Sequence, residues 1–303
     1  MLAEVYLGSI GRGDPVLYYF DSGYRYAPRP NQRHIGQRGV AITLDSKGVR
    51  GVKDWTAPAD GKILFTGASI TWGGTYIDDK DLYSNVVCVH LDKALNRDLT
   101  CGNAGVNAYG IDNMAERIRY NDMGDESAIV VSIFSYSAVI GRIDLDSLPF
   151  FSVPPPGPFK ALWEGTTYGT WKLLRILRSV QNGPSEDSML VAERSFDNLF
   201  AALRETDRAG RKVLIVLLPR REELNGHESD LTKHVRTVLE GSGLDFLDLH
   251  QPISVAAHAE TIFRPDGSHL SRAGHQFVGD RIAERLESFL AERPEDHGNQ
   301  KSK

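Results

Sequence analysis

The chain has 303 residues, enough for one large domain or for one domain with an appendage. Apolar residues make up 41% of it and charged residues 25%, a mix typical of a globular protein, and the formal net charge is −5. This charge argues against a nucleic-acid binder that relies on bulk electrostatics. The sequence contains no run of about 18 apolar residues, so it predicts no membrane-spanning helix.

Cysteine usage excludes two further classes. Cys88 and Cys101 are too few for a disulfide framework or a four-thiolate zinc site, and we expect both to be buried, inert thiols. The opening residues, MLAEVYLGSIGRGD, lack the basic and apolar regions of a signal peptide. We therefore expect a cytoplasmic protein, or an extracytoplasmic one if a longer precursor is trimmed.

Residues 1–58 differ in composition from the rest of the chain. They are rich in Gly, Pro, Tyr and Arg, and short β-like pieces at Val16–Phe20 and Val40–Leu44 are separated by turn residues. The segment is too short to bury a sizeable core of its own. We interpret it as a small β-rich extension.

Residues 59–293 alternate short apolar runs with amphipathic stretches. Near-continuous apolar runs are typical of parallel strands that are covered on both faces, and the pattern predicts a three-layer α/β/α fold with a mainly parallel five-stranded sheet. Residues 141–168 form a long, Pro-rich insertion, in which Phe150 and other aromatic residues are either local packing or a substrate-facing lid. Residues 294–303 are predicted to be a disordered tail. The five runs are KILFT (62–66), LTCG (99–102), IVVSIF (129–134), VLIVLL (213–218) and LDFLDL (244–249).

Residues with catalytic chemistry follow these runs. Ligands bind beyond the carboxyl ends of the strands in open α/β sheets, and Ser69, Gly105 and Ser137 all follow a predicted strand. A serine hydroxyl becomes a nucleophile when a base takes its proton; His269 is the candidate base, and Asp266 would hold its imidazole in one tautomer. The set predicts nucleophilic acyl transfer.

Three sequence blocks carry a resemblance to a known family. GASIT (67–71), NAGVNAYG (103–110) and DGSH (266–269) resemble the blocks of the SGNH hydrolases, also called the GDSL esterase/lipase family. The resemblance implies the flavodoxin-like SGNH fold and a serine esterase that needs no cofactor and no metal. The segment YAPRPNQ, followed by ITLDSKGVRG, also resembles the extension of bacterial SGNH proteins that often handle acyl groups on carbohydrates.

The chain departs from the family pattern at two positions. Ala68 stands where the first block has Asp, and the third block, Gly-x-Asn-Asp in the family, reads Ser135-Tyr136-Ser137-Ala138. The side-chain oxyanion donor, normally Asn, is therefore replaced by Ser137 or by another residue such as Asn107. Losing such a donor typically lowers the rate by about 10²–10³-fold.

These observations predict hydrolysis of a short-chain or acetyl ester, carried by a small molecule or a glycan. Ser69 is the expected nucleophile, His269 the base and Asp266 its partner, with an oxyanion hole formed by Ser69, Gly105 and Ser137. Asn107, Tyr136 and Trp163 are candidate substrate-binding residues. An O-acyltransferase with the same triad, or a degenerate SGNH domain that binds carbohydrate without catalysis, remain as alternatives. No nucleic-acid partner is expected.

Overall fold

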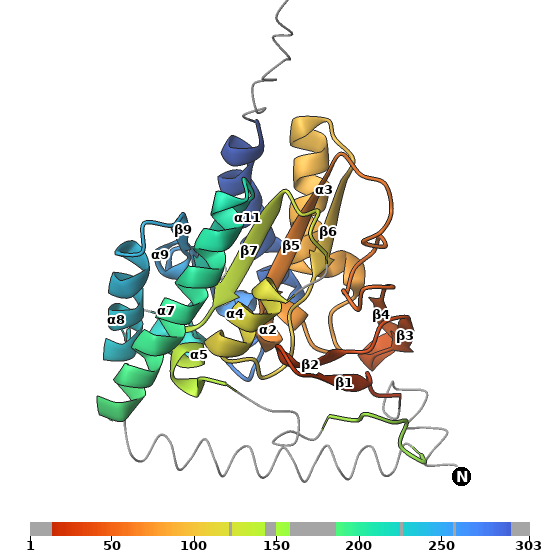
Figure 1. The fold of residues 1–303 in the computed structure, drawn as a ribbon, viewed down its shortest axis with the longest axis horizontal. Helices are drawn as coiled ribbons and strands as arrows, with labels where there is room; N and C mark the ends of the chain where they lie inside the picture. The colour runs from red at the N-terminus through yellow and green to blue at the C-terminus, as the bar shows by residue number, and fades with distance from the viewer. Residues whose placement is uncertain are drawn as a thin grey trace, which may run out of the picture.

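A parallel sheet of five strands forms the centre of the computed structural model, which describes residues 14–120, 123–142, 150–157, 186–224, 227–256 and 259–291 (Figure 1). The strand order is β6-β5-β7-β8-β9, and every neighbouring pair is parallel. Each strand coincides with one of the five predicted apolar runs, so the predicted fold class is confirmed. The strands are β5 (Gly61–Gly67), β6 (Leu99–Asn103), β7 (Ala128–Ile133), β8 (Lys212–Leu217) and β9 (Phe246–Asp248).

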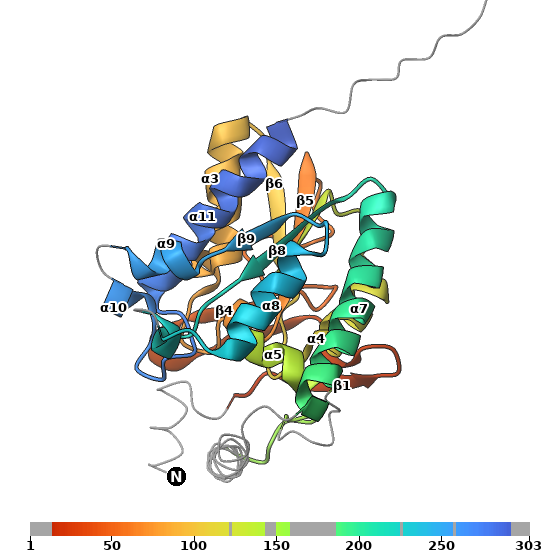
Figure 2. The same ribbon diagram turned by 90° about the vertical axis from the view of Figure 1, so that its left-hand side faces the viewer.

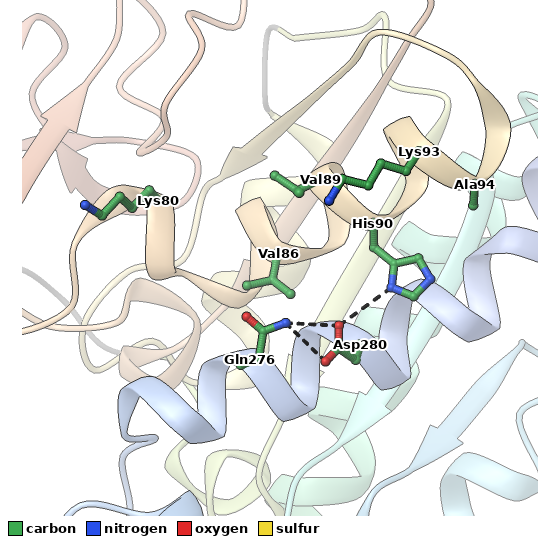
Figure 3. A pocket seen from close by; sticks show the side chains of 8 residues that line it. All are labelled: Lys80, Val86, Val89, His90, Lys93, Ala94, Gln276 and Asp280. Carbon is green, nitrogen blue, oxygen red and sulfur yellow. Dashed lines mark hydrogen bonds and ion pairs between the residues drawn. The ribbon is translucent and has the colours of Figure 1, made fainter.

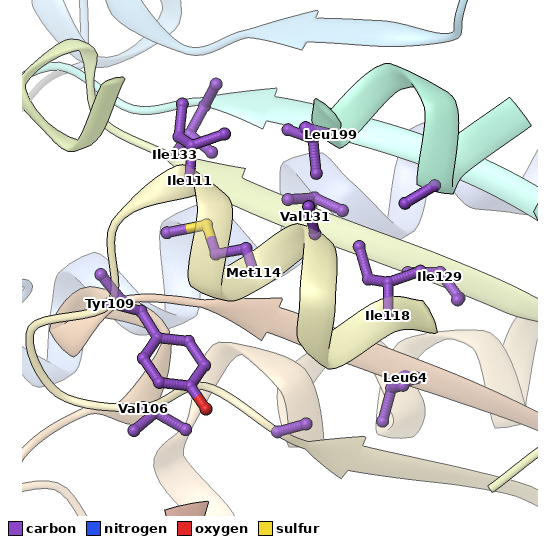
Figure 4. Close-up of a cluster of buried hydrophobic side chains, with 14 of the residues drawn as sticks. Leu64, Val106, Tyr109, Ile111, Met114, Ile118, Ile129, Val131, Ile133 and Leu199 are labelled. Atoms are coloured by element: carbon purple, nitrogen blue, oxygen red, sulfur yellow. The ribbon is translucent and has the colours of Figure 1, made fainter. Parts of the chain in front are cut away.

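Alternate residues of each strand face two different cores. On β5, Leu64 packs in one buried cluster, whereas its neighbours Ile63 and Phe65 pack in the other. On β7, Val131 shares the cluster of Leu64, together with side chains from the helices on that face (Figure 4). Because both faces are buried, the strands need apolar residues at nearly every position.

Helices cover both faces of the sheet and complete the three layers (Figure 2). Apolar side chains of α7 and α11 fall on one face of each helix, as the sequence pattern predicts, and bury Phe196 and Leu199 on α7 and Val278 on α11. The first face carries α4 (Ile111–Arg119), α7 (Glu186–Arg208) and α8 (Asp230–Glu240); the second carries α3 (Tyr83–Leu95), α9 (His250–Ser254), α10 (Ala259–Ile262) and α11 (Arg272–Ala291).

Short helices lie at the end of the sheet that is formed by the carboxyl ends of the parallel strands. The helix α2 (Ser69–Trp72) follows β5, and α5 (Ser135–Ile140) follows β7. A single turn of 3-10 helix, η4 (Arg221–Glu223), lies after β8, and another, η2 (Asp79–Asp81), precedes α3. The strand order reverses at β5, because the chain passes from β5 to β6 on one side and then to β7 on the other. Open α/β sheets bind ligands at such a switch point.

The N-terminal extension consists of two antiparallel hairpins. The first pairs β1 (Tyr18–Asp21) with β2 (Arg25–Pro28), and the second pairs β3 (Gln32–Ile35) with β4 (Ala41–Leu44); a 3-10 turn, η1 (Gln37–Gly39), joins the last two strands. The sequence predicted pieces that overlap β1 and β4, within two residues at each end. It did not resolve β2 and β3, since their Arg, Pro and Gln residues do not alternate with apolar ones.

Side chains of the extension join the core of the sheet. Tyr18, Tyr26 and Trp55 are buried in the same cluster as Leu64, and Phe150 stacks on Tyr18 with ring centroids 4.3 Å apart. Phe150 thus packs against the N-terminal extension, and a role in a substrate-facing lid stays a prediction. The boundary at residues 58 and 59 stays a prediction, as does the tail, and most of the 141–168 insertion, with Trp163, lies outside the described residues.

The two cysteines are paired, which corrects the expectation of inert thiols. Cys88 on α3 and Cys101 on β6 form a disulfide, with their Cα atoms 5.8 Å apart. The sequence could not show this, because the pairing depends on α3 packing back against its neighbouring strand. In the part of the chain that the structure describes, no helix is long and apolar enough to span a membrane.

This disulfide should stabilise the folded chain. A cross-link over 13 residues of separation constrains the unfolded state, and we expect its removal in the Cys88→Ser/Cys101→Ser variant to lower the free energy of unfolding by about 3 kcal/mol. Urea unfolding with and without reductant measures the effect, and the variant should not respond to the reductant. Titration of two free thiols in the unreduced, unfolded protein would contradict the assignment.

Candidate active site

Ser69 begins helix α2 immediately after β5, with its side chain partly exposed at the sheet edge. As the first helical residue, its backbone N–H has no acceptor within the helix and is free to serve another group. Gly67 makes this sharp turn possible. A Cβ atom at Gly67 would lie 2.0 Å from Thr71 Oγ1 and 2.7 Å from Ser132 O, so only glycine fits.

His269 and Asp266 reach Ser69 from the other end of the chain. His269 Nε2 lies 3.0 Å from Ser69 Oγ, and His269 Nδ1 lies 3.1 Å from Asp266 Oδ2. This arrangement assigns the imidazole tautomer with hydrogen on Nδ1, so that Nε2 accepts from the serine hydroxyl. The structure therefore brings together the three residues of the predicted triad, in the order that nucleophilic catalysis requires.

Asp266 is held in place by its own turn. Its Oδ1 accepts hydrogen bonds from the backbone N–H groups of Ser268 and His269, both at 2.9 Å. Partial burial alone would raise the pKa of Asp266, but these N–H groups and the neighbouring His269 lower it below its usual value. The carboxylate is thus ionised and oriented toward Nδ1.

The second block supports helix α2, which begins with the predicted nucleophile Ser69. Asn103 is buried, and its Nδ2 donates to Thr71 O at 2.5 Å, while its Oδ1 accepts from the N–H of Gly105 at 2.9 Å. A Cβ atom at Gly105 would lie 2.7 Å from Trp72 N, so glycine allows this turn to pack on α2. Because the N–H of Gly105 already has an acceptor, its oxyanion role stays a prediction that requires this hydrogen bond to be shared.

The same block contains a strained backbone conformation that the sequence did not predict. Ala108 has a φ of 62°, in the left-handed region that non-glycine residues rarely adopt. Such strain is concentrated at functional sites. Beside it, Asn107 is held by the extension: its Nδ2 donates to Tyr18 Oη at 3.2 Å and its carbonyl accepts from Tyr26 Oη at 2.9 Å. Its role toward substrate stays a prediction.

The third block forms the start of α5. Ser137 is buried, and its N–H donates to Phe134 O at 3.0 Å, whereas Tyr136 is 38% exposed and lies at the rim. The proposed roles of Ser137 and Tyr136 stay predictions. Ser135 is fixed by a hydrogen bond of 2.7 Å between its Oγ and Thr232 Oγ1 of α8.

A buried network of charged side chains contacts α5 through the hydrogen bond between Ser135 and Thr232. Thr232 donates its single hydroxyl hydrogen to the carboxylate of Glu223, so the Ser135 hydroxyl donates to Thr232. His250 Nε2 lies 3.9 Å from Glu223 Oε2, and its Nδ1 lies 2.7 Å from Asp248 Oδ1. The sequence did not reveal this network, since its members come from η4, α8, β9 and α9.

The network shifts the pKa values of its members. Burial alone would lower the pKa of His250, but Asp248 and Glu223 raise it to about 9. Burial alone would likewise raise the pKa values of Glu223 and Asp248, yet the hydrogen bonds and the charge of His250 lower each to about 2. His250 is therefore protonated at neutral pH. Beside it, the N–H of Arg221 donates to Gly267 O at 2.9 Å and so touches the turn that carries His269.

Arg50, from the extension, fixes the segment that follows the nucleophile helix. Its guanidinium is fully buried and donates to Trp72 O and Gly74 O at 2.7 Å, to Ile77 O at 2.5 Å and to Asp79 Oδ1 at 2.8 Å. Burial lowers the pKa of Arg50 and raises that of Asp79, and each partner offsets part of the shift of the other.

A shallow hollow on the outer surface lies away from these residues. It runs between α3 and α11, and none of its lining residues is a predicted site residue (Figure 3). His90 and Gln276 both contact Asp280 there, at 3.6 Å and 3.1 Å. Three of its polar residues thus contact one another, and the predicted catalytic residues lie elsewhere.

Comparisons with solved structures bear on the fold. A lipase from a goat rumen metagenome matches with a TM-score of 0.52 and 10% identity, over 75% of this chain and 97% of that one. This chain has the SGNH hydrolase fold. A lipase/acylhydrolase from Enterococcus faecalis (TM-score 0.48, 15% identity, 76% and 96% covered) and an acetylxylan esterase from Geobacillus stearothermophilus (0.47, 12%, 76% and 95%) are also similar. No protein-family model and no curated protein matches the chain.

Within the SGNH fold, Arg50 should stabilise the nucleophile segment strongly. The Arg50→Met variant leaves Asp79 charged and buried, and we expect the free energy of unfolding to fall by about 3–5 kcal/mol. Chemical denaturation measures the loss. Adding Asp79→Asn to that variant removes the uncompensated charge and should restore part of the stability. A loss below about 1 kcal/mol in Arg50→Met would contradict this account.

The His250 network predicts a pH dependence of stability. Folded His250 keeps its proton up to a pH of about 9, whereas the unfolded side chain loses it near its usual pKa of 6.5. The stabilisation is therefore complete below pH 6.5 and is lost as the pH rises through 9. We expect the free energy of unfolding to decline over this range, and His250→Gln to flatten the decline. His90→Gln on α3 is the control, and an equal slope in wild type and His250→Gln would refute the assignment.

Proposed function

We propose that the chain is a serine-dependent carboxylic ester hydrolase. The observation that carries the proposal is the pair of contacts at His269, with Ser69 Oγ 3.0 Å from Nε2 and Asp266 Oδ2 3.1 Å from Nδ1. A serine hydroxyl beside an imidazole that is itself oriented by a carboxylate is the arrangement that nucleophilic acyl transfer requires. The fold is shared with a lipase, itself an ester hydrolase, which is consistent with the proposal.

The proposed reaction proceeds through an acyl-enzyme. Ser69 Oγ attacks the ester carbonyl while its proton passes to His269 Nε2, and Asp266 stabilises the imidazolium. His269 then returns the proton to the leaving alcohol as the carbon–oxygen bond breaks. A water molecule, deprotonated by the same nitrogen, attacks the acyl-enzyme and releases the acid and free Ser69.

Oxyanion stabilisation is proposed to come from the N–H of Ser69, with Gly105 and Ser137 as further donors. The first N–H of a helix points outward and favours negative charge. The shorter reach of a serine hydroxyl, compared with the family's Asn, leaves the third donor weaker. We therefore expect a slower enzyme than one that carries Asn at position 137.

The proposed substrate is a short-chain ester, such as an acetyl group on a carbohydrate. Its support is the resemblance of the YAPRPNQ extension to those of bacterial SGNH proteins that handle such groups. The Cys88–Cys101 disulfide favours an oxidising, extracytoplasmic setting over the cytoplasm, because disulfides persist mainly outside reducing compartments.

A fluorophosphonate probe tests the nucleophile. We expect the wild type to react covalently with the probe and to hydrolyse p-nitrophenyl acetate, whereas Ser69→Ala should lose labelling and at least about 10³-fold of the turnover. Ser288→Ala, on the exposed side of α11, is the matched control and should behave as wild type.

Other outcomes separate the alternatives. Equal labelling of wild type and Ser69→Ala would refute the nucleophile. No labelling and no turnover by the wild type would favour a degenerate, carbohydrate-binding domain. Acyl transfer to an added glycan in place of acid release would favour the O-acyltransferase.

A further inference from the structure

Tyr76 and Arg264 form a contact between the two halves of the candidate active site. Tyr76 lies in the segment that follows the nucleophile helix, and Arg264 opens the turn that carries His269. The guanidinium carbon of Arg264 lies 3.6 Å from the centroid of the Tyr76 ring. Cation–π contacts reach out to about 6 Å, so this pair is closely stacked.

Arg264 is tied to the catalytic turn through its backbone as well. Its N–H donates to His269 O at 2.8 Å, its carbonyl accepts from Gly267 N–H at 2.9 Å, and its Nε lies 3.8 Å from Asp266 Oδ2. The Nε has no hydrogen-bond partner among the described residues. The side chain is therefore held chiefly by its stacking on Tyr76 and its charge contact with Asp266.

Tyr76 is fixed on the opposite side. The carbonyls of Gly74 and Ile77, which flank it, both accept from Arg50. Its ring also meets the imidazole of His269 edge to face, with centroids 6.4 Å apart and an interplanar angle of 78°. One aromatic ring thus touches both the guanidinium and the catalytic imidazole, from a segment that Arg50 holds rigid.

We propose that Arg264 is a positioning residue of the ester hydrolase, which sets the approach of His269 to Ser69 by clamping the catalytic turn against Tyr76. The inference rests on the proposed function, and it concerns a residue that acts through His269 and Asp266. The turn that carries His269 is far from α2 in the sequence, so contacts between the two segments must set the 3.0 Å distance from His269 Nε2 to Ser69 Oγ. A misplacement of about 1 Å can cost about 10²-fold in rate.

Four single variants separate stacking from charge. Arg264→Met removes the charge and Tyr76→Leu removes the ring, and we expect each to lower kcat about ten- to a hundredfold with KM within about twofold of wild type. Arg264→Lys keeps the charge without the planar stack, and its kcat should fall between wild type and Arg264→Met. Tyr76→Phe keeps the ring and removes a buried hydroxyl that has no partner among the described residues, so its kcat should stay near wild type.

A double variant tests whether the two side chains act as one unit. Arg264→Met/Tyr76→Leu should be no slower than the slower single variant, because a clamp is lost once. The matched control is Arg281→Met, which removes a guanidinium stacked 5.4 Å from the Phe277 ring on the outer helix α11 and should leave kcat unchanged. Thermal unfolding of each variant confirms that the protein is folded at the assay temperature.

Several results would overturn the inference while the proposed function survives. These are wild-type kcat in both Arg264→Met and Tyr76→Leu, multiplicative losses in the double variant, or a rise in KM alone, which would instead place Arg264 in contact with substrate. Failure of the proposed function is a separate result, since it would appear in the wild type as Ser69-independent labelling or as no turnover.

Discussion

The buried guanidinium of Arg50 is the contact on which the geometry of the site depends. It donates hydrogen bonds to the carbonyls of Trp72, Gly74 and Ile77 and to the carboxylate of Asp79, so it holds the chain at the end of α2 and beyond at four points. Asp79 in turn accepts from the N–H of Thr43 on β4, at 2.7 Å. A charge this deeply buried is costly unless it is paired and fully hydrogen-bonded, and the cost of leaving any partner unmatched makes the arrangement specific. The extension thereby fixes the segment that follows Ser69 and α2.

A second set of contacts links this segment to His269 and Asp266, the proposed base and its partner. Tyr76 stands on the segment that Arg50 fixes, and it meets both Arg264 and the imidazole of His269. From the opposite side, η4 holds the same turn through the hydrogen bond from Arg221 N–H to Gly267 O, and η4 is anchored by Glu223 in the charge network. The turn that carries His269 is therefore held by Arg264, which stacks on Tyr76, and by the backbone of η4. Preorganisation of this kind lowers the cost of reaching the reactive geometry.

The sequence predicted those parts of the molecule that follow from local pattern. All five strands were predicted, because strands buried on both faces need continuous apolar runs. Ser69, His269 and Asp266 were named as candidates from their sequence blocks, and the structure places their side chains together. What it missed depends on packing between distant segments. The contacts of Arg50 come from segments far from it in the sequence, and Cys88 and Cys101 pair only once α3 has packed on β6. The hydrogen bond from Gly105 N–H to Asn103 Oδ1 likewise cannot be predicted from the sequence. Hydrogen-bond partners and charge networks are properties of the folded chain, and local patterns do not contain them.

The contacts of the first segment bear on the predicted division of the chain at residues 58 and 59. By composition, the first segment is an appendage. In the structure, its Tyr18 and Tyr26 bind Asn107 in the turn that contains the strained Ala108, and its Arg50 donates to the carbonyls of Trp72, Gly74 and Ile77. An enzyme cut at this boundary would keep Ser69, His269 and Asp266 in its sequence. It would lose the charge that neutralises Asp79 and the aromatic side chains that hold the second block, so the triad would remain without the frame that fixes its distances. Arg50 and the aromatic side chains of the first segment therefore hold residues of the candidate site in place, and the boundary at residues 58 and 59 stays a prediction from composition.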